Sequence, residues 1–199
     1  MVRYRYIENI VYELYQNMDH IKFPIDLNSI IGTIPNCRHT SYQRVAMMSR
    51  KKVQEVIDVC ESMSGCTYYD RAKRRYLIMT NEAVFDNNAG RRRWTLAHEI
   101  GHILCGHFEL CPHIEKFAEN DISSYPEYEK EADYFAATLL APMPFFPLMD
   151  IHVADDVQRE FMLSGEASRN RINDYARWKS NKRNIMWDND MQKLFLEKT

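Results

Sequence analysis

The sequence predicts an α+β protein in which helices predominate over a small sheet, and three observations lead to this class. Of its 199 residues, 45% are apolar, which is enough to form a hydrophobic core. Only six glycines and seven prolines are present, too few for an all-β sandwich that turns about every ten residues. Apolar residues recur at helical spacing in several segments, whereas a few short segments have the composition of strands.

Helical spacing is clearest near the amino terminus and in the central and carboxy-terminal parts of the chain. Ile7, Val11 and Leu14 lie on one stripe together with Ile10 and Met18, which predicts an amphipathic helix. The same reasoning predicts further helices over residues 49–60, 91–106, from Tyr128 onwards, over 154–161 and over 166–178.

Strand composition marks three further segments. Residues 66–69 and 76–80 are rich in tyrosine, threonine and apolar side chains and flank a charged turn at 70–74, which predicts a β-hairpin. Residues 38–45 are predicted as an edge strand. Residues 106–128 contain two prolines and are long for a connection, so we expect a functional loop or flap.

The composition limits the class of function and the compartment. Lysine and arginine total 26 against 28 acidic residues, so the net charge is -2 and direct nucleic-acid binding is not expected. The apolar runs are far shorter than the roughly 18 residues of a membrane-spanning helix, and no secretion signal is recognisable. We therefore expect a cytoplasmic protein without membrane contact. The five cysteines include no C-x-x-C pair, which predicts neither a disulfide framework nor a zinc ribbon.

Residues 95–102 read Thr-Leu-Ala-His-Glu-Ile-Gly-His and contain an H-E-x-x-H motif. On a helix, His98 and His102 lie one turn apart on the same face and can both bind one Zn²⁺ at about 2.0–2.1 Å. Glu99 is rotated to the side, where its carboxylate can act as general base toward a water that the metal activates. The alternative of two surface histidines fits poorly, because this helix is one of the least polar in the chain.

A catalytic zinc site usually has three protein ligands, so we expect a third from another segment. The acidic start of the helix over residues 127–137 offers one, since Glu129 and Asp133 are spaced i, i+4 and share a face. If Glu129 binds the metal, Asp133 is placed to accept the free ring N–H of a ligating histidine. Glu127 and Glu131 are interpreted as charges that complement the helix dipole.

Two blocks, residues 92–102 and 129–142, resemble in sequence and order the ImmA/IrrE family of bacterial metallopeptidases. The resemblance implies a thermolysin-like (zincin) core with a small sheet near the active helix. It also implies one zinc ion bound by His98, His102 and Glu129, with Glu99 as general base. Members of the family cut a partner repressor that carries a helix-turn-helix domain, and so relieve repression of transcription. The expected protein is thus a cytoplasmic endopeptidase of a bacterium, prophage or mobile element.

The expected organisation is a zincin-like metallopeptidase domain over residues 1–150 and a helical extension over residues 151–199 packed on it. In the extension, Arg169, Arg171 and Arg177 are of the type that contacts DNA in a helix-turn-helix. Acidic residues alternate with these arginines, which favours plain packing or substrate docking. The tail beyond the second helix is left open as a docking helix, a strand or a disordered segment.

Other polar residues near the motif have alternative interpretations. Cys105, His107, Cys111 and His113 resemble a second metal cluster, although their spacing lacks the central loop of known zinc fingers and favours packing. An oxyanion formed during peptide hydrolysis needs a donor about 3 Å away. The candidates for that donor are His107, His113, Tyr125, Tyr128 and Tyr134.

Two other classes of function remain compatible with the sequence. One is a non-catalytic module with structural zinc that binds a repressor or DNA, but a purely structural site has no need of Glu99. The other is a toxin-like component paired with a helix-turn-helix antitoxin.

Overall fold

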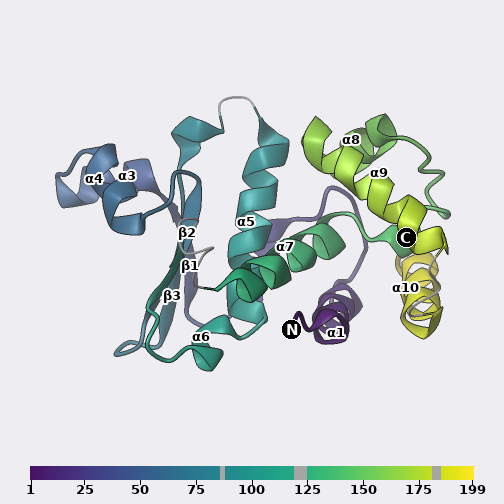
Figure 1. Ribbon diagram of the computed structural model, residues 1–199, viewed down its shortest axis with the longest axis horizontal. Helices are drawn as coiled ribbons and strands as arrows, with labels where there is room; N and C mark the ends of the chain where they lie inside the picture. The colour runs from purple at the N-terminus through teal and green to yellow at the C-terminus, as the bar shows by residue number, and fades with distance from the viewer. Residues whose placement is uncertain (86–87, 119–124, 181–184) are drawn as a thin grey trace.

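The computed structural model describes residues 1–85, 88–118, 125–180 and 185–199, and in them it shows the predicted α+β class (Figure 1). These residues form ten α-helices and one four-stranded sheet. The strands are β1 (Cys37–Ser41), β2 (Gly65–Asp70), β3 (Arg75–Thr80) and β4 (Lys116–Ala118). The helices are α1 (Tyr4–Gln16), α2 (Leu27–Thr33), α3 (Tyr42–Ser49), α4 (Val53–Cys60), α5 (Ala89–Leu104), α6 (His107–Leu110), α7 (Pro126–Leu140), α8 (Ala154–Phe161), α9 (Gly165–Ser180) and α10 (Ile185–Lys198).

The sheet has the strand order β1-β3-β2-β4. β2 and β3 form the predicted antiparallel hairpin, in which Thr67 lies opposite Ile78. β1 pairs parallel with β3 at one edge, and β4 pairs antiparallel with β2 at the other. Because alternate residues point to opposite faces, Ile78 belongs to the main core beside α5, whereas Cys66 and Met79 pack with α3 and α4. The two faces of the sheet therefore serve two separate clusters.

Two boundaries before the hairpin differ from the prediction. The strand predicted over residues 38–45 ends at Ser41, whose side-chain oxygen accepts a hydrogen bond from the Arg44 backbone N–H at 3.1 Å and caps α3. The helix predicted over residues 49–60 is wrong in its first turn, because the backbone is left-handed at Arg50 (φ 56°) and α4 begins only after it. A serine cap satisfies a free backbone N–H at the start of a helix. Here this hydrogen bond stabilises the start of α3, and the strand ends at the same residue.

Residues 106–128, expected as a loop or flap, contain α6 and β4. Arg71 in the hairpin turn fixes their course, since its Nη2 donates at 2.9–3.2 Å to the backbone carbonyl oxygens of Phe108, Cys111 and Ile114. β4 has only three residues, too few for a strand pattern to indicate it. The part of this prediction that falls on residues 119–124 lies outside the described residues.

α5 lies between the sheet and α7 (Figure 1). At the contact with α7, a Cβ added to Gly101 would lie 3.0 Å from Phe135 Cδ1 and 3.2 Å from Ala132 Cα. A side chain at this position would therefore hold the two helices apart. The glycine of the H-E-x-x-H motif is what lets α7 approach α5 closely.

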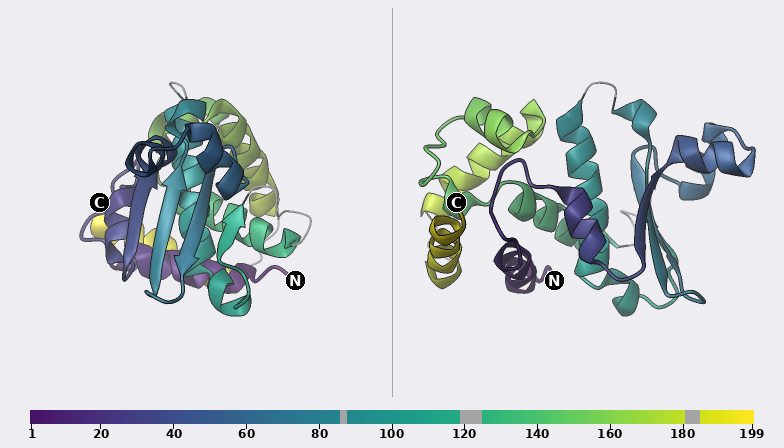
Figure 2. Two further views of the ribbon diagram at one scale, coloured as in Figure 1. Left: turned by 90° about the vertical axis from the view of Figure 1, so that its left-hand side faces the viewer. Right: turned by 180° about the vertical axis from the view of Figure 1, so that it is seen from behind.

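The carboxy-terminal helices α8, α9 and α10 lie on the side of the molecule opposite the sheet (Figures 1 and 2). Phe161, Tyr175 and Leu194 of these helices belong to the same core cluster as Ile7 of α1. The boundary expected at residue 150 stays a prediction. None of the described helices combines the length and the apolar character needed to cross a bilayer.

Of the three arginines of α9 considered as DNA contacts, Arg169 and Arg177 are exposed and Arg171 is buried. Arg171 is 4% exposed, and its Nε donates at 2.7 Å to the carbonyl oxygen of Ala141, the C-cap of α7. A cation is favourable at a helix carboxyl end, so this arginine has a packing role. Arg177 is paired with Asp174 on its own helix.

The tail forms α10, which docks on the amino-terminal helix. Trp187 Nε1 donates to the Glu8 carbonyl oxygen at 2.9 Å, and the Ile21 backbone N–H donates to the Lys198 carbonyl oxygen at 3.1 Å. The sequence leaves the tail open as a docking helix, a strand or a disordered segment, and the structure shows a docking helix. Residues 181–184 lie outside the described residues.

Candidate metal centre

α5 directs both histidines of the motif toward one point. The helix begins after Asn88, whose side chain caps it by accepting a bond from the Arg91 backbone N–H at 2.9 Å. His98 and His102 follow one turn apart, and their Nε2 atoms lie 3.0 Å from each other. His102 is buried and His98 is partly exposed.

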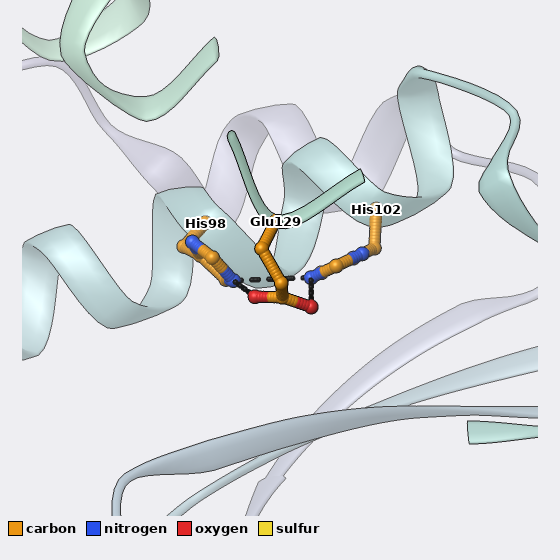
Figure 3. A group of neighbouring side chains, drawn as sticks. All are labelled: His98, His102 and Glu129. Atoms are coloured by element: carbon orange, nitrogen blue, oxygen red, sulfur yellow. Dashed lines mark hydrogen bonds and ion pairs between the residues drawn. The ribbon is translucent and has the colours of Figure 1, made fainter. Parts of the chain in front are cut away.

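Glu129 of α7 completes the group (Figure 3). Its Oε2 lies 3.2 Å from His98 Nε2, and its Oε1 lies 3.5 Å from His102 Nε2. When three ligand atoms bind a tetrahedral zinc ion at the usual bond lengths, they lie about 3.3 Å from one another. Among the described residues, this is the group of His, Cys, Asp and Glu side chains whose donor atoms converge, all within 4.8 Å. The spacing is that of a metal site.

The hydrogen bonding of Glu129 is also consistent with a bound cation. Its Oε1 is buried and accepts no hydrogen bond from the described residues. A buried carboxylate oxygen without a partner costs free energy, which a metal ion at this point would offset. Two imidazole nitrogens and a carboxylate are ligands that suit zinc. The residues present therefore fit a metal ion.

Asp133, one turn after Glu129, contacts the other ring nitrogen of His98, with Oδ1 2.9 Å from Nδ1. This is the contact expected from the i, i+4 spacing, and it leaves Nε2 of His98 free to bind a metal. Burial alone lowers the pKa of His98, but Asp133, Glu129 and Glu99 outweigh it and raise that pKa to about 10. Burial holds the pKa of His102 well below its ordinary value. The carboxylates thus create a field that favours a positive charge at this site.

Glu99 lies beside the metal group and points toward the sheet. It is 5% exposed, and the Thr67 hydroxyl of β2 donates to its Oε2 at 2.7 Å. Gly65 on the same strand lets α5 approach the sheet closely, because a Cβ there would lie 2.7 Å from Thr95 Cγ2. The sequence analysis missed Thr67, since one threonine in a strand carries no signal of such a contact.

Glu131 lies beyond the first turn of α7, so its interpretation as a charge that complements the helix dipole is wrong. It is 1% exposed and lies under the metal group, where it is bonded to Arg3 and His107. Burial alone would raise the pKa of Glu131, but the bonds from Arg3 outweigh it and lower that pKa. Glu127, by contrast, lies in the first turn of α7, where a negative charge complements the helix dipole as expected, and its side chain is exposed.

Two of the five candidates for the oxyanion donor are held in contacts away from the cavity. Tyr134 OH donates to Glu8 Oε1 at 2.8 Å on the α1 side of α7, and His107 is fully buried. The cavity over the metal group, of about 470 Å³, is lined by neither of them. His113, Tyr125 and Tyr128 do not line it either, and their role stays a prediction.

The second metal cluster is not formed by the described residues. His107 is bonded to Glu131, and His113 Nε2 lies 2.9 Å from Tyr125 OH. Cys105 and Cys111 are buried thiols, and no group of ligand atoms converges on them in the described part of the chain. These side chains pack, as their spacing favoured.

Comparison with known proteins agrees with this site. The family model Peptidase_M78, described as the IrrE N-terminal-like domain, matches residues 57–173, more than half of the chain. The chain therefore belongs to this metallopeptidase family, and the resemblance seen in the sequence is confirmed. No curated protein matches the chain. The matched range runs from α4 into α9 and includes both helices that carry the metal group.

Proposed function

We propose that this protein is a zinc-dependent endopeptidase with a thermolysin-like core that cleaves one specific protein. The observation that carries the proposal is the convergence of His98, His102 and Glu129, with Glu99 beside them on the cavity wall. Membership of a metallopeptidase family supports the same activity.

The residues around the cavity have separate roles in hydrolysis. His98, His102 and Glu129 would hold one zinc ion, which would polarise the scissile carbonyl and lower the pKa of a bound water to about 7. Glu99 takes a proton from the attacking water and passes it to the departing amine. The water oxygen bonds to the carbonyl carbon, the C–N bond breaks, and an acid and an amine are released.

The proposed substrate is a helix-turn-helix transcriptional repressor, cut in the cytoplasm of a bacterium that carries the gene on a prophage or mobile element. The sequence resemblance to the ImmA/IrrE family supports this substrate class. The buried Arg171 and the Arg177–Asp174 pair speak against α9 as a DNA-contacting helix, which favours a protein substrate over DNA as the partner.

The test compares the wild type with Glu99→Gln, using the repressor encoded beside the gene as substrate. Both proteins should bind one zinc ion, and the variant should cleave at least about 100-fold more slowly because it has lost the general base. Glu127→Gln is the matched control, since it neutralises an exposed carboxylate and should cleave like the wild type. Mass spectrometry of the products measures the rate and the bond cut.

Two results would contradict the proposal. Wild-type cleavage by Glu99→Gln would remove the role given to this residue. A wild type that binds zinc but cuts neither the repressor nor any member of a random peptide library would favour the non-catalytic module.

A further inference from the structure

We propose that His107, held by Glu131 and Arg3, is a positioning residue that fixes the ring of His102 for metal binding. The inference rests on the metal site of the proposed function. His107 was considered above as a metal ligand or an oxyanion donor, and the structure places it behind the site.

The contacts form one buried chain of hydrogen bonds that leads away from the metal group. Figure 3 shows the second ring nitrogen of His102 directed away from Glu129. On that side, His102 Nδ1 lies 3.0 Å from His107 Nδ1, and His107 Nε2 lies 3.1 Å from Glu131 Oε2. His102, His107 and Glu131 are each no more than 1% exposed.

Proton positions along the chain follow from the donor and acceptor rules for imidazole. If Nε2 of His102 binds a metal, its proton must be on Nδ1. That N–H can only be donated to a bare Nδ1 of His107, so His107 carries its own proton on Nε2. This second N–H donates to the carboxylate of Glu131. Each group in the chain thus has one partner of the right kind, and the metal-binding tautomer of His102 is the one selected.

Arg3 anchors the far end of the chain. Its Nε lies 3.0 Å from both oxygens of Glu131, and its backbone N–H donates to Oε1 at 2.8 Å. Its Nη2 also donates at 2.8 Å to the carbonyl oxygen of Cys105, the C-cap of α5. A single arginine before α1 therefore holds the end of the histidine helix and the carboxylate of α7 together, and it balances the buried charge of Glu131.

Aromatic rings prevent His107 and His102 from turning. Tyr128 stacks on His107 at a centroid distance of 4.8 Å, and Phe117 of β4 stacks on His102 at 4.6 Å. The hydrogen bonds therefore act on rings whose planes are already restrained. Partners of this kind commonly change metal affinity by about 10- to 100-fold when removed.

The experiment measures zinc affinity by competition with a chromophoric chelator, with zinc alone as the ligand. His107→Leu can accept no bond from His102, and its affinity should fall by about 10- to 100-fold. His107→Asn is smaller than histidine but places an acceptor oxygen near the position of Nδ1, so it should recover most of the affinity. Tyr15→Phe is the matched control, because it removes a buried hydrogen bond to the Leu139 carbonyl oxygen of α7 and should bind zinc like the wild type.

A variant of Arg3 covers the case in which His107→Leu does not fold. Arg3→Met removes the side-chain bonds to Glu131 from a partly exposed position and should lower zinc affinity by about 3- to 10-fold. Cobalt loaded in place of zinc gives a second readout, since its visible absorption band should shift in His107→Leu and Arg3→Met but not in Tyr15→Phe.

The outcomes separate this inference from the proposed function. If the wild type binds no zinc, the metal site itself fails. If the wild type binds zinc and the folded variants of His107 or Arg3 bind it equally well, with unchanged cobalt spectra, the metal site stands and the positioning role is overturned.

Discussion

Each side chain of the motif is oriented by a partner outside the motif. Asp133 orients His98, the chain through His107 orients His102, and Thr67 orients Glu99. A carboxylate that must accept and release a proton needs such a restraint, because proton transfer depends on reach and angle. The hydroxyl of Thr67 supplies it from the sheet.

Thr67→Val tests this restraint with almost no change in volume. Loss of the bond to Glu99 should lower kcat by about 10- to 100-fold, as expected for a hydrogen bond to a charged group worth about 1.5–3 kcal/mol, while zinc affinity stays the same. Steady-state cleavage kinetics and the chelator competition measure the two quantities. An unchanged kcat would show that Glu99 is oriented without Thr67.

The sequence predicts the residues that bear the chemistry better than those that hold them. His98, Glu99 and His102 share a motif whose spacing suffices, and Glu129 with Asp133 lies on one helical face. Arg3 and Thr67 lie far from the motif in sequence, so no local pattern indicates them. Their roles depend on how the chain packs.

The crossing of two helices brings the third metal ligand to the histidines. α5 carries His98 and His102, α7 carries Glu129, and the helices touch at Gly101, where a Cβ would lie 3.0 Å from Phe135 Cδ1. A small increase in their separation would move Glu129 away from both imidazoles. The close contact between α5 and α7 therefore sets the distance from Glu129 to the two histidines.

Gly101→Ala should lower both stability and zinc affinity. Overpacking of this contact should cost about 1–3 kcal/mol and outweigh the gain in helix propensity. Gly32→Ala in α2 is the control, because nothing lies within 4 Å of its added Cβ and the alanine should stabilise the protein by about 0.5–1 kcal/mol. Urea unfolding and chelator competition measure the two effects. Equal zinc affinity in Gly101→Ala and the wild type would contradict the account of this crossing.

Periodicity predicts several helices but not α10, which has 14 residues and is left open by the sequence, and it fails on the shortest elements. α1, α5, α8 and α9 follow an apolar stripe, and the hairpin follows its composition. β4 has three residues and α6 has four, so neither shows a period. Both are held by contacts from elsewhere, Arg71 among them.

At the scale of the whole molecule, the helices at the two ends of the chain, α1 and α10, pack against each other. Trp187 of α10 donates to the backbone of Glu8, and the neighbouring Asp188 accepts a bond from Trp178 Nε1 of α9 at 3.2 Å. Burial raises the pKa of Asp188 to about 6, against the effect of the Trp178 bond. The docking of α10 therefore favours the protonated carboxyl.

This gives a pH dependence with a definite sign. Because the pKa of Asp188 is higher in the folded than in the unfolded state, its contribution to stability falls as pH rises from about 4 to about 6, and the penalty is complete above that range. Asp188→Asn should raise Tm at about pH 7.5, and the gain should shrink toward about pH 4.5. Asp190→Asn, an exposed position on the same helix, should change little. A gain that is equal at both pH values would contradict the buried carboxyl.

The central claim is tested most directly by anomalous diffraction at the zinc edge from crystals of the zinc-loaded protein. We predict one zinc ion within about 2.0–2.2 Å of His98 Nε2, His102 Nε2 and a Glu129 oxygen, with Glu99 outside the coordination sphere. A zinc ion bound elsewhere, or one bound by the histidines while Glu129 lies beyond bonding distance, would contradict the account.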